Sequence, residues 1–156
     1  MGSSNVRPLV PATLKYAERL ARETFDMPLA KHGLIGRHEY LDHTNYFIVP
    51  EAGGLEMLWY YDMLGMSPRA VLELRIDQDS FSRLTWESGK GWRYSMMGGE
   101  DERRIEPRGA EFLHAVNQLL AADFTVGIEY PVKQDRVADI VEFHAQAFLS
   151  VKGRNT

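Results

Sequence analysis

The sequence contains no cysteine. Disulfide bonds, cysteine nucleophiles and thiolate metal ligands are therefore excluded. A cysteine-free chain is compatible with the periplasm and with the reducing cytoplasm, and we expect a cytoplasmic location. The 156 residues are the usual length of one domain and can bury a core without a metal or a disulfide. We predict a single domain over residues 1–156, with flexible ends at 1–10 and 152–156.

No stretch of the sequence is long and apolar enough to span a bilayer. The most apolar segment, residues 55–66, is interrupted by Glu56 and Asp62. It is also shorter than the roughly 20 residues that a spanning helix needs. The segment from Met1 to Leu20 lacks the apolar run of a signal peptide. We therefore expect no membrane association.

The chain also lacks an excess of basic residues. Its formal net charge is −4, and its basic clusters are interleaved with or flanked by acidic residues. Nucleic-acid binding draws much of its affinity from neutralising phosphates, so a nucleic-acid partner is disfavoured. No polybasic run is present that would bind anionic lipid.

Motifs for cofactor binding and nucleophilic catalysis are absent as well. The glycine groups at 53–54, 89–91 and 98–99 form no dinucleotide-binding or phosphate-binding pattern, and no serine lies in a Gly-x-Ser-x-Gly turn. Asp77 and Asp79 are not followed by the further oxygen ligands of a calcium loop. We predict no cofactor and interpret these segments as turns between strands.

Three helices are predicted from apolar residues at helical spacing. Pro11 opens the first helix and Pro28 ends it, while Gly153 stops the last one. The predicted ranges are 12–25, 107–122 and 134–151.

Strands are predicted where apolar and polar residues alternate or where β-branched and aromatic residues gather. The predicted ranges are 44–49, 55–63, 70–76, 81–87, 92–97 and 124–130. Residues 30–43 are predicted to be irregular or a short helical turn. Consecutive strands joined by glycine turns favour an antiparallel sheet. The expected fold class is therefore α+β, with an antiparallel sheet of about five to six strands and three helices packed mainly on one face.

Aromatic residues are concentrated on three of these predicted strands. Because alternate residues of a strand point to opposite faces, Trp59 and Tyr61 share a face that Tyr60 does not. The residues concerned are Trp59, Tyr60, Tyr61, Trp86, Trp92 and Tyr94. They either fill the core between sheet and helices or, with the neighbouring methionines, form a binding surface.

The second alternative predicts a small interaction protein of the accessory, inhibitor or immunity type. Its partner would be another protein or a second copy of the chain. The chain is like accessory, inhibitor and immunity proteins in its size and fold class alone.

A different hypothesis is a small enzyme or ligand-binding domain with a pocket between sheet and helices. His144 interrupts an apolar stripe of the last predicted helix, and Glu111 and His114 lie three residues apart on the preceding helix. Histidine can act as a general acid or base, with Glu142, Glu111 or Asp139 as an orienting carboxylate. A histidine enclosed by apolar side chains would instead be a core residue with satisfied hydrogen bonds.

Three further histidines, His32, His38 and His43, lie close together in the sequence beside Glu39 and Asp42. Imidazole and carboxylate groups are the ligands that zinc, nickel or iron take in proteins. Their spacing fits no single helical face, and the competing interpretation is a polar loop with its histidines in water. A metal site here is the weakest of the three hypotheses.

Overall fold

The computed structural model describes residues 12–101 and 103–154. Seven strands form one antiparallel sheet in which each strand pairs with the next in chain order. Their bounds are β1 Arg37–Leu41, β2 Thr44–Ala52, β3 Leu55–Leu64, β4 Ser67–Asp77, β5 Ser80–Glu87, β6 Gly91–Met97 and β7 Tyr130–Pro131. This meander is the arrangement that consecutive hairpins produce.

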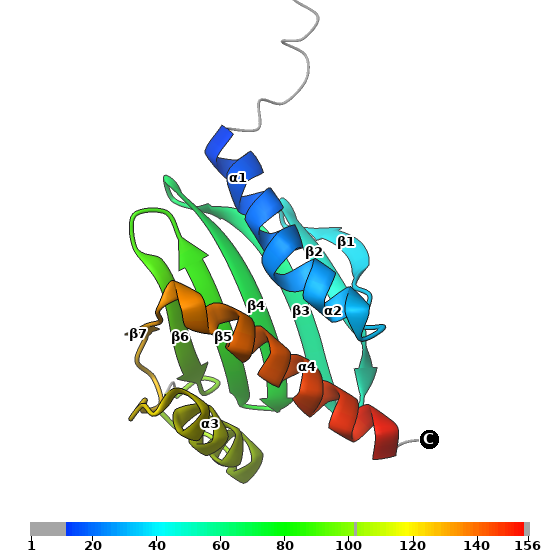
Figure 1. Ribbon diagram of the computed structural model, residues 1–156, viewed down its shortest axis with the longest axis vertical. Coiled ribbons are helices and arrows are strands. Elements are labelled where there is room, and N and C mark those ends of the chain that lie inside the picture. Colours follow the sequence, from blue (N-terminus) through cyan, green and yellow to red (C-terminus); the bar gives the residue numbers. More distant parts are fainter. Residues whose placement is uncertain (1–11, 102, 155–156) are drawn as a thin grey trace, which may run out of the picture.

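The helices are α1 Ala12–Ala21, α2 Met27–Lys31, α3 Pro107–Leu120 and α4 Val137–Arg154, with the π-helical turn η2 Arg22–Asp26 and the 3₁₀ turn η3 Gln134–Arg136. Figure 1 shows α1, α2 and α4 lying across one face of the sheet. Helix α3 packs beside β4 and β5 at the end of the sheet. The predicted α+β class, with helices mainly on one face, is confirmed, and the sheet has seven strands rather than five or six.

The covered face of the sheet carries the apolar core. Trp59, Leu72, Leu84 and Tyr94 stand opposite one another across β3 to β6, and each is fully buried. Phe25, Leu29, Ile140 and Phe148 cover this row from the helices. Burying such side chains is the main source of stability in a domain of this size.

Proline does not end the first helix as predicted. The chain passes through η2, where the Met27 amide donates to the Arg22 carbonyl five residues earlier, and continues as α2 to Lys31. Pro28 lies in the first turn of α2, directly after this wider turn. The chain therefore passes through the wider π-helical turn η2 and returns to α-helical hydrogen bonding in α2.

Strand β1 was not predicted, because its residues Arg37–Leu41 show no apolar alternation. It is an edge strand joined to β2 by Asp42 and His43, both with positive φ of 48° and 65°. Such a two-residue turn is most often made with glycine, which this turn lacks. The sequence therefore contains no glycine signal for the turn between β1 and β2.

Several other predicted bounds change. Strand β2 continues past Pro50 to Ala52 through a bulge, a place where a sheet tolerates proline. The predicted strand 124–130 contributes only its last residue to the short strand β7. Helix α4 runs through Gly153, so this glycine is not a stop. Residues 152–154 thus belong to α4, while residues 1–10, 155 and 156 lie outside the described residues.

Helix α3 is held at its N-terminus by the turn between β4 and β5. Asp77 accepts a hydrogen bond from the Gly109 amide at 3.0 Å, and the Ser80 hydroxyl accepts one from the Glu106 amide at 3.1 Å. A Cβ atom at position 109 would lie 2.5 Å from the Ser80 hydroxyl, so glycine permits this close approach. Asp77 therefore satisfies one free amide in the first turn of α3, and Ser80 satisfies the amide of its N-cap residue.

Candidate functional site

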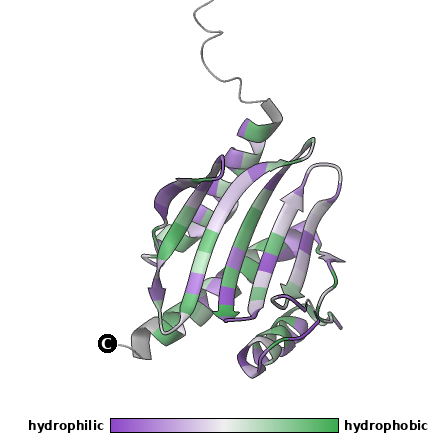
Figure 2. Ribbon diagram, turned by 180° about the vertical axis from the view of Figure 1, so that it is seen from behind, coloured by the Kyte–Doolittle hydropathy of each residue, from purple (hydrophilic) through white to green (hydrophobic). Residues whose placement is uncertain are grey.

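On one face of the sheet no helix of the described residues covers the strands, and we call it the open face. Seen from behind in Figure 2, strands β2–β6 have no helix in front of them, and α3 lies beyond their ends. Strand register places a continuous set of side chains on this face. These are Arg37, Glu39, Tyr46, Ile48, Glu56, Leu58, Tyr60, Asp62, Arg69, Val71, Glu73, Arg75, Phe81, Arg83, Thr85, Glu87, Arg93, Ser95 and Met97.

Four of these side chains form what we call the apolar patch. Tyr46 stands opposite Tyr60, and Ile48 stands opposite Leu58, across strands β2 and β3. The two tyrosine rings lie 5.0 Å apart between centroids. Tyr46, Ile48 and Leu58 are half-buried by their neighbours although no helix covers them, whereas Tyr60 is buried. The patch therefore presents packed, ordered apolar surface.

Ion pairs border the apolar patch on strands β3 to β5. Arg69 donates two hydrogen bonds to Asp62, at 2.7 and 3.1 Å, and its guanidinium lies 5.7 Å from the Tyr60 ring centroid. Arg83 donates to Glu73 at 2.6 and 2.9 Å. Burial, followed by the charge of Glu73, raises the pKa of Tyr60 to about 12. The Tyr60 hydroxyl therefore keeps its proton at neutral pH.

The basic residues of the open face are all arginines. Among the described residues, no strand contains a lysine. Arginine and tyrosine are enriched at protein interfaces, whereas lysine is depleted there. The open face thus carries the arginine and tyrosine that interfaces favour, together with five acidic residues of a class that is depleted there.

The structure separates the six aromatic residues that the sequence singled out. Trp59, Trp92 and Tyr94 are buried on the covered face, and Tyr61 and Trp86 are half-buried on that face. Tyr60 alone lies on the open face. Tyr46, Ile48 and Leu58 were not named as site residues, although the alternation along β2 and β3 would have placed them beside Tyr60.

His144 lies at the centre of a buried hydrogen-bond network. Its Nδ1 is 2.7 Å from the Ile140 carbonyl oxygen, which can only accept, so Nδ1 carries the proton. Nε2 then accepts from the Ser82 hydroxyl at 2.8 Å, and the Tyr94 hydroxyl donates to Ser82 at 2.7 Å. Every polar atom of the imidazole is thus satisfied.

Burial determines the charge state of this network. His144 is fully buried, and desolvation lowers its pKa to about 4. Burial also raises the pKa of Tyr94 above its ordinary value. Both groups are neutral at physiological pH, and neither is accessible to a substrate in this structure. The arrangement is that of a core histidine with satisfied hydrogen bonds.

The other candidates for acid–base chemistry do not join His144. His114 and Glu111 are exposed on α3. Glu142 accepts hydrogen bonds from Gln146 and His32, and Asp139 pairs with Arg136 at 3.2 Å. These hydrogen bonds, Gln146 first, hold the pKa of Glu142 below its usual value. No carboxylate orients His144.

The three histidines considered as metal ligands lie on different elements. His32 follows α2, His38 hydrogen-bonds Asn45 at 2.7 Å from β1, and His43 lies in the β1–β2 turn. Within residues 12–101 and 103–154, no three histidine, aspartate or glutamate side chains are grouped so as to hold a metal ion. The structure thus does not bring these histidines together.

A groove between η2, α2 and α4 contains a histidine–carboxylate contact between distant elements. His32 Nε2 lies 2.9 Å from Glu142 Oε2, although the two residues are 110 positions apart. The groove has a volume of about 520 Å³ and is also lined by Glu23, Lys31 and Asp139. No sequence signal predicts this pairing, because the distance along the chain is too great.

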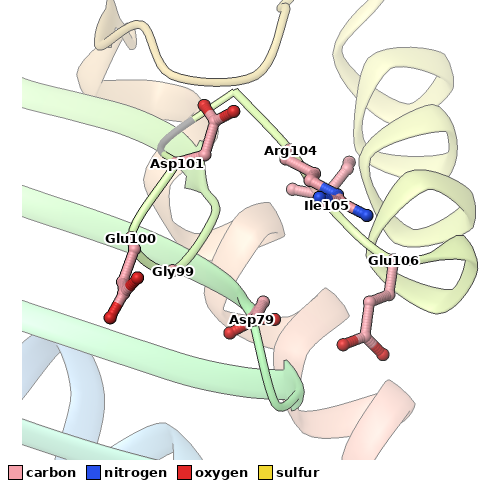
Figure 3. A pocket seen from close by; sticks show the side chains of 7 residues that line it. All are labelled: Asp79, Gly99, Glu100, Asp101, Arg104, Ile105 and Glu106. Carbon is pink, nitrogen blue, oxygen red and sulfur yellow. The ribbon is translucent and has the colours of Figure 1, made fainter.

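A second depression, of about 550 Å³, lies beside the loop that follows β6 (Figure 3). Asp79, Glu100, Asp101 and Glu106 surround it, with Arg104 as the only basic residue among those lining it. The four carboxylates come from the β4–β5 turn and from this loop. Nothing further in the described residues indicates a ligand for it.

None of the helices in the described part of the chain has the length and apolar character that crossing a bilayer requires. Comparison with known proteins adds no assignment. No family model matches the chain, and no curated protein or solved structure is similar to it.

Proposed function

We propose that this protein is a small interaction protein that binds a protein partner, or a second copy of itself, through the open face of its sheet. The observation that carries the proposal is the apolar patch of Tyr46, Ile48, Leu58 and Tyr60 on a face without a covering helix. Interfaces combine an apolar, aromatic centre with a polar rim rich in arginine. We keep the expectation of a cytoplasmic location, with which the absence of cysteine is compatible.

The internal ion pairs of the open face support binding in a second way. Arg69 and Arg83 are each held by a carboxylate, so their side chains are already ordered before a partner arrives. Ordering long side chains during binding costs roughly 0.5–1.5 kcal/mol for each of them. A pre-ordered face loses less of this free energy, which favours specific association.

Site-specific photo-crosslinking tests the proposal. A photoreactive phenylalanine analogue replaces Tyr46 on the open face or, as a matched control, Tyr40 on strand β1. Tyr40 is 60% exposed, and its register places it on the opposite face. We expect a discrete adduct from position 46 that mass spectrometry identifies, and none from position 40. Equal labelling at both positions, or no adduct at either, would contradict the proposal.

Ligand binding is a second candidate function, favoured by the groove that contains His32 and Glu142. His144 gives it no support, because that side chain has no solvent access. Screening of small molecules by NMR tests it: amide shifts confined to residues 23–32 and 134–142 would support a site. Shifts spread over the whole surface would count against one.

A further inference from the structure

The open face is divided by charge along the seam between β3 and β4. Strands β1–β3 place three carboxylates and one arginine on it, namely Glu39, Glu56, Asp62 and Arg37. Strands β4–β6 place four arginines and two carboxylates on it, namely Arg69, Arg75, Arg83, Arg93, Glu73 and Glu87. One half is therefore negative and the other positive.

Such a face is complementary to itself. A two-fold axis lying along the seam would place strands β1–β3 of one copy over strands β6–β4 of the other. An isologous interface of this kind uses the same surface on both copies. The negative half of each copy then meets the positive half of the second copy, and electrostatic complementarity of this sort favours one orientation over others.

The residues nearest the seam define the contacts most clearly. Glu56 stands opposite Arg75 in the strand register, and Asp62 stands opposite Arg69. Rotation about the seam brings each of these carboxylates over the matching guanidinium of the second copy. Packed sheets cross at about 30°, so residues close to the axis keep this alignment better than residues at the edges.

Two of these charges are available for a partner. Glu56 and Arg75 are both exposed, and neither forms an ion pair with any other residue that the structure describes. The Arg75 guanidinium lies 4.8 Å from the centroid of the Phe81 ring. This contact is with an aromatic ring and not with a carboxylate. Asp62 and Arg69, in contrast, already pair within the chain.

The size of the face is sufficient for a dimer. Six strands about 4.8 Å apart span roughly 29 Å, and about seven residues at 3.3 Å each span roughly 23 Å. The overlap is therefore roughly 670 Å² on each copy, or roughly 1,300 Å² in total. Specific interfaces bury about 1,200–2,000 Å² in total. Tyr60 and Val71 flank the seam and are already buried by their neighbours, so the longer side chains around them would make the contact.

We infer that the partner of the open face is a second copy of this chain, paired face to face about the β3–β4 seam. This inference rests on the proposed function, because it names the partner of the same surface. The complex is a symmetric dimer whose axis runs along the seam, between Tyr60 and Val71. Glu56 of each copy pairs with Arg75 of the other.

Charge reversal and charge exchange test the arrangement. Light scattering and sedimentation of the purified chain at about 100 µM should give twice the mass of one chain. Arg75→Glu places a carboxylate against Glu56 of the second copy, so we expect dimerisation to weaken at least about tenfold. The double variant Glu56→Arg with Arg75→Glu restores opposite charges at both contacts and should recover the dimer.

A matched control separates this effect from net charge. Arg103→Glu makes the same charge change in the exposed loop after β6 and should leave the dimer intact. Circular dichroism and the melting temperature of each variant establish that it is folded. Failure of the double variant to recover the dimer, or an equal loss in Arg103→Glu, would overturn the proposed pairing.

Failure of this inference differs from failure of the proposed function. A wild-type chain that stays monomeric at about 100 µM overturns the dimer. If position 46 then crosslinks to a different identified protein, the open face is still a binding surface and only its partner was wrong. If the chain is monomeric and position 46 crosslinks to nothing, both proposals are overturned.

Discussion

The two faces of the sheet are built from the same strands, yet they differ in nearly every property. On the covered face, Trp59 and Leu72 are fully buried against helices. On the open face, their neighbours Leu58 and Glu73 are only partly buried, and Glu73 forms an ion pair with Arg83. One residue of displacement along a strand thus separates a core position from a candidate binding position.

We propose that the covered face supplies stability and the open face recognition. Core side chains are removed from water entirely, and their loss leaves a cavity. Most open-face side chains contact water on one side, although Tyr60 and Val71 do not, so the loss of an exposed one removes less buried area. Substitutions on the covered face should therefore change the free energy of unfolding, while substitutions on the open face should change association. Four predictions test this division, from the largest expected effect to the smallest.

Replacing Trp59 with alanine should have the largest effect. Its ring is fully buried and stacks on Phe47 with 4.1 Å between centroids. We expect Trp59→Ala to lower the free energy of unfolding by about 3–5 kcal/mol. Leu58→Ala, one residue away on the open face, should lower it by only about 1 kcal/mol. Urea denaturation measures both, and equal losses would remove the distinction between the faces.

The pH dependence of stability should report His144. The pKa of its imidazole is about 4 in the folded protein and about 6.5 in an unfolded chain, so between these values the unfolded state binds more protons. Stability is therefore fully present above about pH 6.5 and is lost as the pH falls towards 4, by about 3 kcal/mol.

Denaturation at pH 7 and pH 4 measures this change for wild type and for His144→Gln. The variant should show a smaller decrease, because its side chain does not titrate. His114→Gln on the exposed face of α3 is the control and should behave as wild type. A wild-type decrease that His144→Gln leaves unchanged would assign the pH dependence to other groups.

Removing the Ser82 hydroxyl should leave two buried groups without their partner. Ser82 donates to His144 and accepts from Tyr94, so Ser82→Ala leaves a nitrogen and a hydroxyl unsatisfied. We expect a loss of about 1–3 kcal/mol. Ser150→Ala, at an exposed position of α4, should change stability by less than about 0.5 kcal/mol. A loss no greater than that of the control would mean that water replaces the hydroxyl.

Breaking an ion pair on the open face should have the smallest effect. Glu73 and Arg83 are partly solvated, so Glu73→Gln should lower the free energy of unfolding by no more than about 1 kcal/mol. The loss should shrink further in high salt, because salt screens exposed charges. A loss above about 2 kcal/mol would show that the open face also stabilises the fold.

Part of the architecture could be predicted from local patterns. The alternation of β3 and the glycine turn before it gave β3 within one residue of its observed bounds and its hairpin with β2, because hairpins depend on neighbouring residues alone. Strand β1 and the helical continuation past Pro28 were missed. Strand β1 lacks apolar alternation and its turn lacks glycine, while the helical continuation depends on a hydrogen-bond shift that has no signature in composition.

The candidate site was less predictable than the fold. Period-two alternation showed that Trp59 and Tyr60 face opposite ways, but it could not show which face the helices cover. Five of the six aromatic residues proved to lie on the covered face. The apolar patch contains only one of the residues that the sequence singled out.

The sequence by itself determined the class of this protein: a cysteine-free α+β domain with an antiparallel meander, because strand alternation and turn chemistry are local properties. Only the tertiary structure decided which face of that meander became core. It also brought His144 to Ser82, 62 positions away, and His32 to Glu142, 110 positions away. Contacts at such separations depend on how helices dock on the sheet, and this is set by packing of the whole chain rather than by any segment of it.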